Sequence, residues 1–167
     1  MGKGKIVICD SQKKQLRQYE SMENVKYIGS IEHFISYMDE LEKEVIRREN
    51  ELKNVIDKID HIRNFEKNIF LIDDLSNFYS HKTNAKEEIA DMFLRAAGVG
   101  ICIAATNQIT NFYGSDPVTM LFKTSENGVL LSPQGHLGVV PVSLSPGKNE
   151  GVIYKQSYSA IVRIPKV

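Results

Sequence analysis

The sequence has few of the features that mark secreted or membrane proteins. It contains two cysteines, no N-terminal signal peptide, and no apolar run close to the roughly 20 residues that a membrane-spanning helix needs. Cys9 and Cys102 both lie within apolar, strand-like runs, so we expect two buried, reduced thiols and no disulfide. We therefore expect a soluble, cytoplasmic chain.

An excess of charge of one sign is also missing. Lys and Arg together number 21, and so do Asp and Glu, which leaves no formal net charge to attract a nucleic acid. We expect no nucleic-acid partner. The four histidines show no ligand spacing and no accompanying cluster of cysteines or carboxylates, which argues against a metal site built on histidine.

The glycine-rich loop that binds nucleotide phosphates is absent from the sequence. No Gly-x-x-x-x-Gly-Lys-Ser/Thr stretch occurs in the 167 residues, and that loop supplies the backbone N–H groups that surround the phosphates. The stretch Gly2-Lys3-Gly4-Lys5 precedes the first expected strand and has no following Ser or Thr, so it does not replace the loop. We therefore expect no cofactor in this chain alone.

What the sequence does contain is the pattern of one α/β domain. Hydrophobic residues make up 42% and charged residues 25%, the composition of a globular domain with a substantial core. Four apolar runs predict the strands of a parallel sheet, residues 6–10, 25–28, 69–72 and 101–105. Residues 85–97 predict a helix between the last two. Short strands and tight turns are predicted at the C-terminal end, with apolar runs at 129–131, 138–142, 151–154 and 159–164.

A long amphipathic helix, or two helices, is predicted after Ser30. Ser30 suits an N-cap, and apolar residues recur at helical spacing from Ile31 to Ile62. The apolar stripe lapses at residues 47–50, so we expect the second half to leave the domain surface or to bend. Acid-first charge pairs four residues apart suit an exposed face; they are Asp39–Lys43, Glu44–Arg48 and Glu49–Lys53. A partner helix on a coiled-coil seam is the alternative to packing on the sheet.

Polar side chains follow two of the expected strands. Asp73 and Asp74 come after the run 69–72, and Thr106 and Asn107 come after the run 101–105. Open α/β sheets bind their ligands at the carboxyl ends of strands, so these four side chains are a candidate site. In a nucleotide site Asp73 would hold Mg²⁺ through water and Asp74 would polarise the attacking water. Thr106 and Asn107 would sense the γ-phosphate. The alternative is that two strands simply end in polar turn residues.

Five segments together resemble the last ATPase-like domain of EssC proteins, the FtsK/SpoIIIE-family motors of type VII secretion systems. They are residues 6–10, the long helix, 70–74, 98–107 and 160–167, the last ending in Ile-Pro-Lys-Val. The resemblance covers the chain from about residue 6 onward. It implies an α/β, partial RecA-like P-loop NTPase fold, a parallel sheet flanked by helices with short C-terminal strands and without its Walker A half. Residues 1–167 would then be a single domain, the C-terminal fragment of an FtsK/SpoIIIE-like ATPase domain.

The resemblance also assigns roles to the four candidate residues. Asp73 falls at the Walker B aspartate, and Asp74 falls where the catalytic glutamate would be. Thr106 and Asn107 fall on the sensor strand. Two departures weaken the enzymatic role: an aspartate at position 74 reaches one methylene less far than a glutamate, and the Walker A segment lies upstream of Met1 or is absent. ATP and Mg²⁺ are cofactors of the parent family.

By resemblance, the chain is the cytoplasmic end of a membrane-anchored translocase. Its partners would be secreted WXG-type proteins and other ATPase domains of the same protein. We expect a domain that recognises substrates or regulates export without hydrolysing ATP. The alternatives are an ATP-binding or ATP-hydrolysing motor domain that takes its phosphate loop from upstream sequence or a neighbouring subunit, and a DNA translocase module.

Two further expectations concern contacts with other molecules. A sheet cut after its phosphate loop exposes apolar strand edges, so we expect the chain to form homo-oligomers. The turn-rich loops 132–136 and 145–150 are the expected recognition surface, because loops on a rigid scaffold usually carry binding specificity. The alternative for these loops is that they are ordinary hairpin turns.

Overall fold

A computed structural model describes most of the chain. The described residues are 4–10, 12–76, 85–107, 115–125, 127–130, 147, 150–155 and 158–163. The chain divides into two compact units, residues 1–107 and residues 108–167.

The first unit is built on a four-stranded parallel sheet. Its strands are β1 (Lys5–Cys9), β2 (Val25–Ile28), β3 (Asn68–Ile72) and β4 (Ile101–Ala105), in the order β2-β1-β3-β4. All four strands predicted from the apolar runs are confirmed. The first residues of β1, β3 and β4 pair in one row across the sheet, and this row marks its amino edge.

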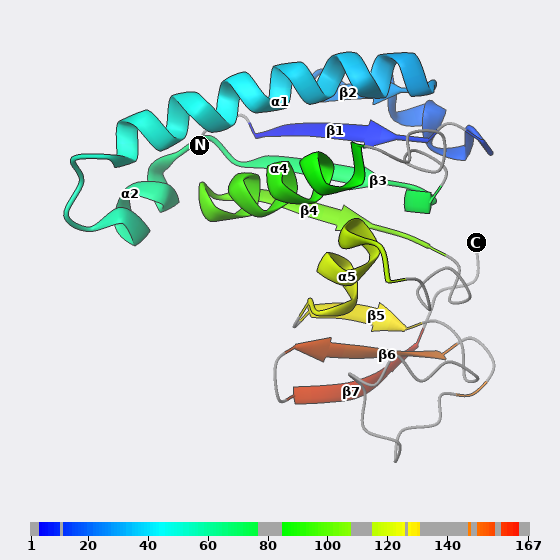
Figure 1. The fold of residues 1–167 in the computed structure, drawn as a ribbon. Helices are drawn as coiled ribbons and strands as arrows, with labels where there is room; N and C mark the ends of the chain where they lie inside the picture. The colour runs from blue at the N-terminus through cyan, green and yellow to red at the C-terminus, as the bar shows by residue number, and fades with distance from the viewer. Residues whose placement is uncertain are drawn as a thin grey trace. The chain divides into compact units, whose positions relative to one another are not determined.

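Among the described residues, two long helices pack on this sheet and two short ones lie in its connections (Figure 1). They are the 3₁₀ helix η1 (Gln15–Tyr19), α1 (Ile31–Leu52), α2 (Lys58–Asn64) and α4 (Lys86–Gly98). The ring of Phe70 in β3 lies 6.2 Å from Phe34 and 5.0 Å from Tyr37 of α1, and 6.0 Å from Phe93 of α4, between ring centroids. One core side chain of the sheet therefore contacts both long helices, and α1 packs on the sheet as ordinary tertiary structure. The predicted α/β fold with flanking helices is confirmed.

Helix α1 begins as predicted and is followed by a second helix. The Ser30 side chain accepts a hydrogen bond from the His33 N–H at 3.3 Å, which caps the first turn. The predicted amphipathic segment forms two helices, α1 and α2, which is the second of the two predicted alternatives. Gly100, with φ of +80°, follows α4, and a Cβ there would lie 2.5 Å from Ile62 Cγ2 of α2. Glycine is required at this position because of both its conformation and the close approach of α2.

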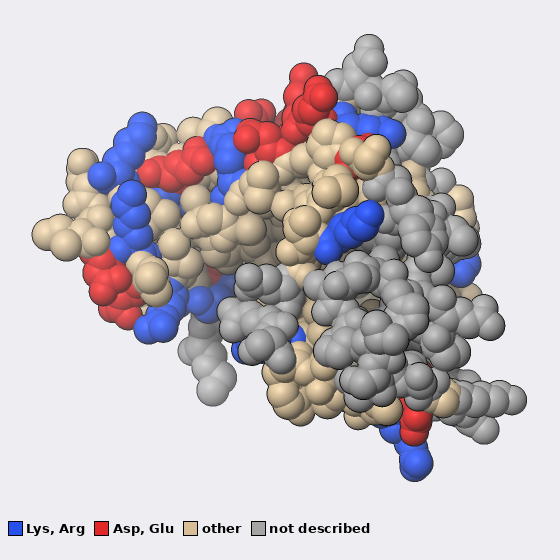
Figure 2. Space-filling view, turned by 60° about the horizontal axis from the view of Figure 1, so that its bottom comes forward, with Lys and Arg blue, Asp and Glu red and all other residues tan. Residues whose placement is uncertain are grey.

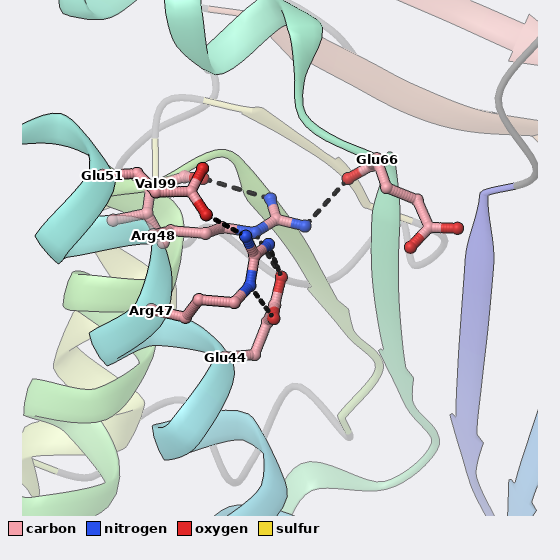
Figure 3. A network of polar contacts seen from close by, with 6 residues as sticks. All are labelled: Glu44, Arg47, Arg48, Glu51, Glu66 and Val99. Carbon is pink, nitrogen blue, oxygen red and sulfur yellow. Dashed lines mark hydrogen bonds and ion pairs between the residues drawn. The ribbon is translucent and has the colours of Figure 1, made fainter. Parts of the chain in front are cut away.

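Arg48 overturns the expectation that the buried face of the helix lapses around it. The side chain is fully buried. Its guanidinium donates to Glu44 Oε1 at 2.7 Å, to the Val99 carbonyl at 3.2 Å and to the Glu66 carbonyl at 2.9 Å (Figure 3). It also lies 4.9 Å from the centroid of the Phe65 ring. A charged residue on the buried face is satisfied by three acceptors, so the packing face of α1 continues to its end.

Glu49, the neighbour of Arg48, ties α1 to α4. Its carboxylate accepts two hydrogen bonds from the Arg95 guanidinium, at 2.9 and 2.8 Å. The sequence pairs Glu49 with Lys53 four residues on, but the ion pair in the structure is the one with Arg95. The face of α1 that was expected to be solvated is thus partly an interhelical contact.

The two thiols differ, contrary to the expectation that both are buried. Cys9 is buried in β1, whereas Cys102 in β4 is exposed. Burial alternates along β4, with Ile101 buried and Ala104 exposed. The continuous apolar run predicted a strand covered on both faces, but described residues cover only one face of β4. Among the described residues, no helix combines the length and apolar character needed to cross a membrane.

The second unit contains α5 (Pro117–Lys123) and an antiparallel sheet of β5 (Asn127–Leu130), β6 (Glu150–Lys155) and β7 (Tyr158–Arg163), in that order. The predicted C-terminal strands are confirmed except for 138–142, which lies outside the described residues. Loop 132–136 lies outside them too. In loop 145–150, the Gly147 N–H donates to Glu150 Oε2 at 2.9 Å. The recognition role of both loops stays a prediction.

Candidate functional site

The candidate site lies at the carboxyl edge of the parallel sheet, where β3 and β4 end side by side. Ile72 and Ala105 are Cα partners in the last row of this strand pair. The backbone ladder then continues past the strands, because the Thr106 N–H donates to the Ile72 carbonyl at 2.9 Å and the Leu75 N–H donates to the Thr106 carbonyl at 2.9 Å. The sheet therefore fixes the positions of the residues that follow both strands.

Three of the four predicted site residues meet at this edge. The Thr106 hydroxyl donates to Asp73 Oδ1 at 2.6 Å and accepts a hydrogen bond from the Asp74 N–H at 3.0 Å. The ends of β3 and β4 therefore bring Asp73, Asp74 and Thr106 into contact. The hydroxyl proton of Thr106 is directed at a carboxylate of the same chain, so a phosphate oxygen would have to compete with Asp73 for it.

Asp74 turns the chain away from β3 through an uncommon backbone conformation. Its φ is +55°, in the left-handed region that costs a residue with a Cβ roughly 1 kcal/mol. The Ser76 hydroxyl donates to Asp74 Oδ1 at 2.8 Å, a local contact of the kind that lets aspartate adopt this region. Sequence reasoning missed Ser76, because no spacing in the sequence indicates this side-chain contact.

Asn107, the fourth predicted residue, follows Thr106 directly and is half-buried. Its predicted role in sensing a γ-phosphate stays a prediction. The roles of Asp73 and Asp74 in catalysis stay predictions as well.

A third carboxylate at this edge, Asp10, was not among the predicted site residues. It follows β1 and is 1% exposed. Its side chain accepts hydrogen bonds from the Lys14 N–H at 2.9 Å and the Leu16 N–H at 2.8 Å, and its carbonyl accepts one from the Tyr27 hydroxyl at 2.9 Å. Asp10 therefore organises the loop after β1, and its lone pairs are engaged by the chain itself.

The described residues do not form a complete site for Mg-ATP. Mg²⁺ in nucleotide sites is held by one or two carboxylates together with the phosphates, which need their own backbone cradle. Asp73 offers the carboxylate, but the sequence has no phosphate loop. Among the described residues, no group of three or more His, Cys, Asp or Glu side chains is placed to hold a metal ion. That Asp73 holds Mg²⁺ when a nucleotide binds stays a prediction.

Comparisons with known proteins give matches at the level of structure only. No protein-family model matches the chain, and no curated protein sequence matches it. The cytoplasmic domain of EssC aligns with a TM-score of 0.77 over 97% of this chain and 34% of its own, at 19% identity. EssC ATPases 2 and 3 from Geobacillus thermodenitrificans align with a TM-score of 0.77 over 97% of this chain and 31% of theirs, at 18% identity.

A third structure is that of EccC ATPases 2 and 3 from Thermomonospora curvata, solved in complex with a signal sequence peptide. It aligns with a TM-score of 0.69 over 98% of this chain and 31% of its own, at 12% identity; EccC is a type VII secretion ATPase. At these identities the likeness shows that the chain has the fold of these ATPase domains. The chain spans about a third of the length of these structures.

Proposed function

We propose that this chain acts in a type VII secretion translocase as an ATPase-like domain that recognises substrates or regulates export and does not hydrolyse ATP. The observation that carries the proposal is the pairing of an EssC-type fold over 97% of the chain with a sequence that lacks the phosphate loop. Residues 1–167 contain the scaffold of this fold and no stretch that would supply the backbone N–H groups around the phosphates of ATP.

The geometry of the carboxyl edge supports the non-hydrolysing part of the proposal. The Thr106 hydroxyl is engaged by both Asp73 and Asp74. The Asp74 carboxylate accepts from Ser76 and is one methylene shorter than a glutamate. The Thr106 hydroxyl, Asp73 Oδ1 and Asp74 Oδ1 thus already have hydrogen-bond partners within the chain.

The partners that we propose follow from the same likeness. The Thermomonospora curvata EccC structure holds a signal sequence peptide, which supports secreted WXG-type proteins as partners of this chain. Neighbouring ATPase domains of a longer protein and a second copy of this chain are the other proposed partners. The domain would act in the cytoplasm, with ATP and Mg²⁺ bound elsewhere in the translocase.

Two titrations test this proposal. Peptides from the C-termini of candidate secreted proteins, labelled with a fluorophore, should bind the chain saturably, and scrambled peptides of the same composition should not. Mg-ATP should give no measurable heat in titration calorimetry. If no candidate peptide binds more tightly than its scrambled control, substrate recognition by this chain is refuted.

The second candidate function is an ATP-binding or ATP-hydrolysing motor domain, completed by a phosphate loop from upstream sequence or another subunit. The observation in its favour is that Asp73, Asp74 and Thr106 meet at the carboxyl edge, where α/β sheets bind ligands. Micromolar ATP binding that is lost in Asp73→Asn would establish this function over the first.

A DNA translocase module is the third candidate, and the surface charge disfavours it. Figure 2 shows lysine and arginine side chains lying among acidic ones on the face in view. Binding to DNA depends on clustered cations that neutralise several phosphates at once. With equal numbers of basic and acidic residues in the whole chain, we propose no nucleic-acid partner.

A further inference from the structure

A second candidate site, independent of the secretion proposal, lies at the opposite end of the sheet. A pocket of about 590 Å³ opens between α1 and the amino edge. Lys5, Asn68 and Ile101 line it on the sheet side; they are the first residues of β1, β3 and β4 and form one row. The pocket is therefore separated by the length of the strands from Asp73 and Thr106.

Two polar groups lining this pocket have no hydrogen-bond partner among the described residues. Tyr37 of α1 is 7% exposed, yet no described group pairs with its hydroxyl. Asn68 Oδ1 is buried and unpaired. Burial raises the pKa of Tyr37 above its ordinary value, which keeps the hydroxyl protonated as a donor. Buried polar atoms in folded proteins almost always have a partner, so Asn68 Oδ1 calls for one from outside the described residues, whereas the Tyr37 hydroxyl can also be met by solvent.

The charged groups around the pocket divide into paired and unpaired ones. Arg47 is bound to Glu44 at 2.7 Å, and Glu40 is bound to Lys26 at 2.6 Å. The charged residues of the lining that lack an ion pair within the described part of the chain are Lys5, Lys43 and Glu66. In Figure 3 the carboxylate of Glu66 points away from Arg48, which is bound instead by the Glu66 carbonyl.

These groups define a ligand with both charges and an apolar part. Two ammonium groups and a tyrosine hydroxyl donor suit a carboxylate. The Glu66 carboxylate and Asn68 Oδ1 are acceptors and suit an ammonium. Leu41 and Ile101, each 2% exposed, supply an apolar wall. A simple anion such as phosphate would leave Glu66 unpaired and facing like charge.

We propose that this pocket binds a free α-amino acid with an apolar side chain. The carboxylate pairs with Lys5 and Lys43 and accepts from the Tyr37 hydroxyl. The ammonium pairs with Glu66 and Asn68, and the side chain lies against the apolar wall. The alternative occupant is ordered water, which a polar pocket of this size readily holds.

Titration calorimetry on the full chain with L-leucine, L-valine and L-phenylalanine tests the proposal. At least one should bind saturably at millimolar concentration or below. For leucine, 4-methylpentanoate lacks the ammonium and 3-methylbutylamine lacks the carboxylate. Each should bind at least about tenfold more weakly, because each loses the charged group that pairs with one side of the pocket. The corresponding analogues serve for the other two amino acids.

Variants of the lining separate this site from weak surface binding. Tyr37→Phe keeps the ring and removes the hydroxyl, and Lys43→Gln removes one ammonium; each should weaken amino-acid binding about tenfold. Lys58→Gln, on the exposed surface of α2, is the matched control and should leave binding unchanged. Circular dichroism confirms that each variant is folded.

Three results would overturn the proposal. The first is that none of the three amino acids binds saturably, which would leave water as the occupant. The second is equal binding of the deaminated analogue, which would show a simple carboxylate site. The third is unchanged binding in both Tyr37→Phe and Lys43→Gln while both remain folded.

Discussion

At the carboxyl edge of the parallel sheet, the Thr106 hydroxyl joins Asp73 and Asp74 on an exposed surface. At the amino edge, the fully buried guanidinium of Arg48 joins three acceptors. Both arrangements link the ends of β3 and β4 through one polar side chain. They differ in access to water, and water competes for exposed hydrogen bonds. Burial makes the amino edge a determinant of stability, and exposure leaves the carboxyl edge accessible to other molecules.

Among the substitutions at the two edges, replacement of Arg48 should lower the free energy of unfolding the most. Arg48→Met keeps the apolar length of the side chain but removes its donors, so the buried Val99 carbonyl and the partly buried Glu66 carbonyl lose their partner and Glu44 keeps only Arg47. We expect the free energy of unfolding to fall by about 3–5 kcal/mol, the usual loss for one member of a buried charged network. Urea denaturation measures it.

The adjacent arginine provides the control for that experiment. Arg47 also pairs with Glu44, but its side chain is 50% exposed. Arg47→Met should lower the free energy of unfolding by less than about 1 kcal/mol, as for other exposed ion pairs. Equal losses in the two variants would show that burial does not distinguish the two arginines.

Asp10 tests whether the loss of stability depends on the burial of the side chain or on the edge of the sheet at which it lies. It lies at the carboxyl edge but is 1% exposed, with two N–H donors bound to its carboxylate. Asp10→Asn replaces one acceptor oxygen with an NH₂ group that faces an N–H, and should cost about 2 kcal/mol in urea denaturation. Asp57→Asn is the control, because asparagine caps a helix as well as aspartate does and Asp57 caps α2 from an exposed position.

Low pH should reduce the stability of the protein by protonating Glu44 near the amino edge. Hydrogen bonds and charge from Arg47, and then from Arg48, lower the pKa of Glu44 from 4.5 to about 2. Because the pKa is lower in the folded state, this stabilisation is fully present above about pH 4.5 and is lost as the pH falls towards 2. The side chain is 28% exposed, so solvent screening reduces the effect to about 1–2 kcal/mol.

Urea denaturation of the wild type and of Glu44→Gln at several pH values measures this effect. The difference in stability between the two proteins should be largest above pH 4.5 and should shrink as the pH approaches 2. Glu42→Gln, which lies on the same helix, controls for the general effect of removing a carboxylate. A difference that does not change with pH would rule out ionised Glu44 as the source.

The smallest effect is expected at the exposed carboxyl edge. Thr106→Val removes the hydroxyl that joins Asp73 to the Asp74 N–H, and should lower the free energy of unfolding by about 1 kcal/mol, because water can replace both partners. Thr106→Ser keeps the hydroxyl and should restore most of the loss. A loss in Thr106→Val as large as that in Arg48→Met would remove the distinction between the two edges.

The strands and helices could be predicted because local patterns specify them. A continuous apolar run predicted β3, and Ser30 predicted the start of α1. Burial of Arg48 could not be predicted in the same way, because its acceptors include the carbonyl of Val99, 51 residues away in the chain. An argument from apolar spacing assigns every charged residue to the exposed face of a helix, whereas a long charged side chain can be buried when acceptors inside the fold pair with it.

In the candidate site, too, some features could be predicted from the sequence and others could not. That Asp73 and Thr106 lie together follows from the rule that parallel strands end at a common edge. The left-handed conformation of Asp74 and the contact from Ser76 depend on how the chain leaves β3, which no spacing reveals. Exposure of Cys102 was missed because an apolar run does not report whether both faces of its strand are covered.

The reach of Arg48 also has a consequence for the order of folding. Its guanidinium bonds to the Val99 carbonyl across 51 residues and to the Glu66 carbonyl across 18, so both contacts require long loops to close first. Because loop-closure entropy must be lost before a non-local contact contributes, we expect these two contacts to form late in folding. In stopped-flow measurements Arg48→Met should therefore accelerate unfolding and leave the refolding rate almost unchanged, which makes this arginine a determinant of how long the native state lasts.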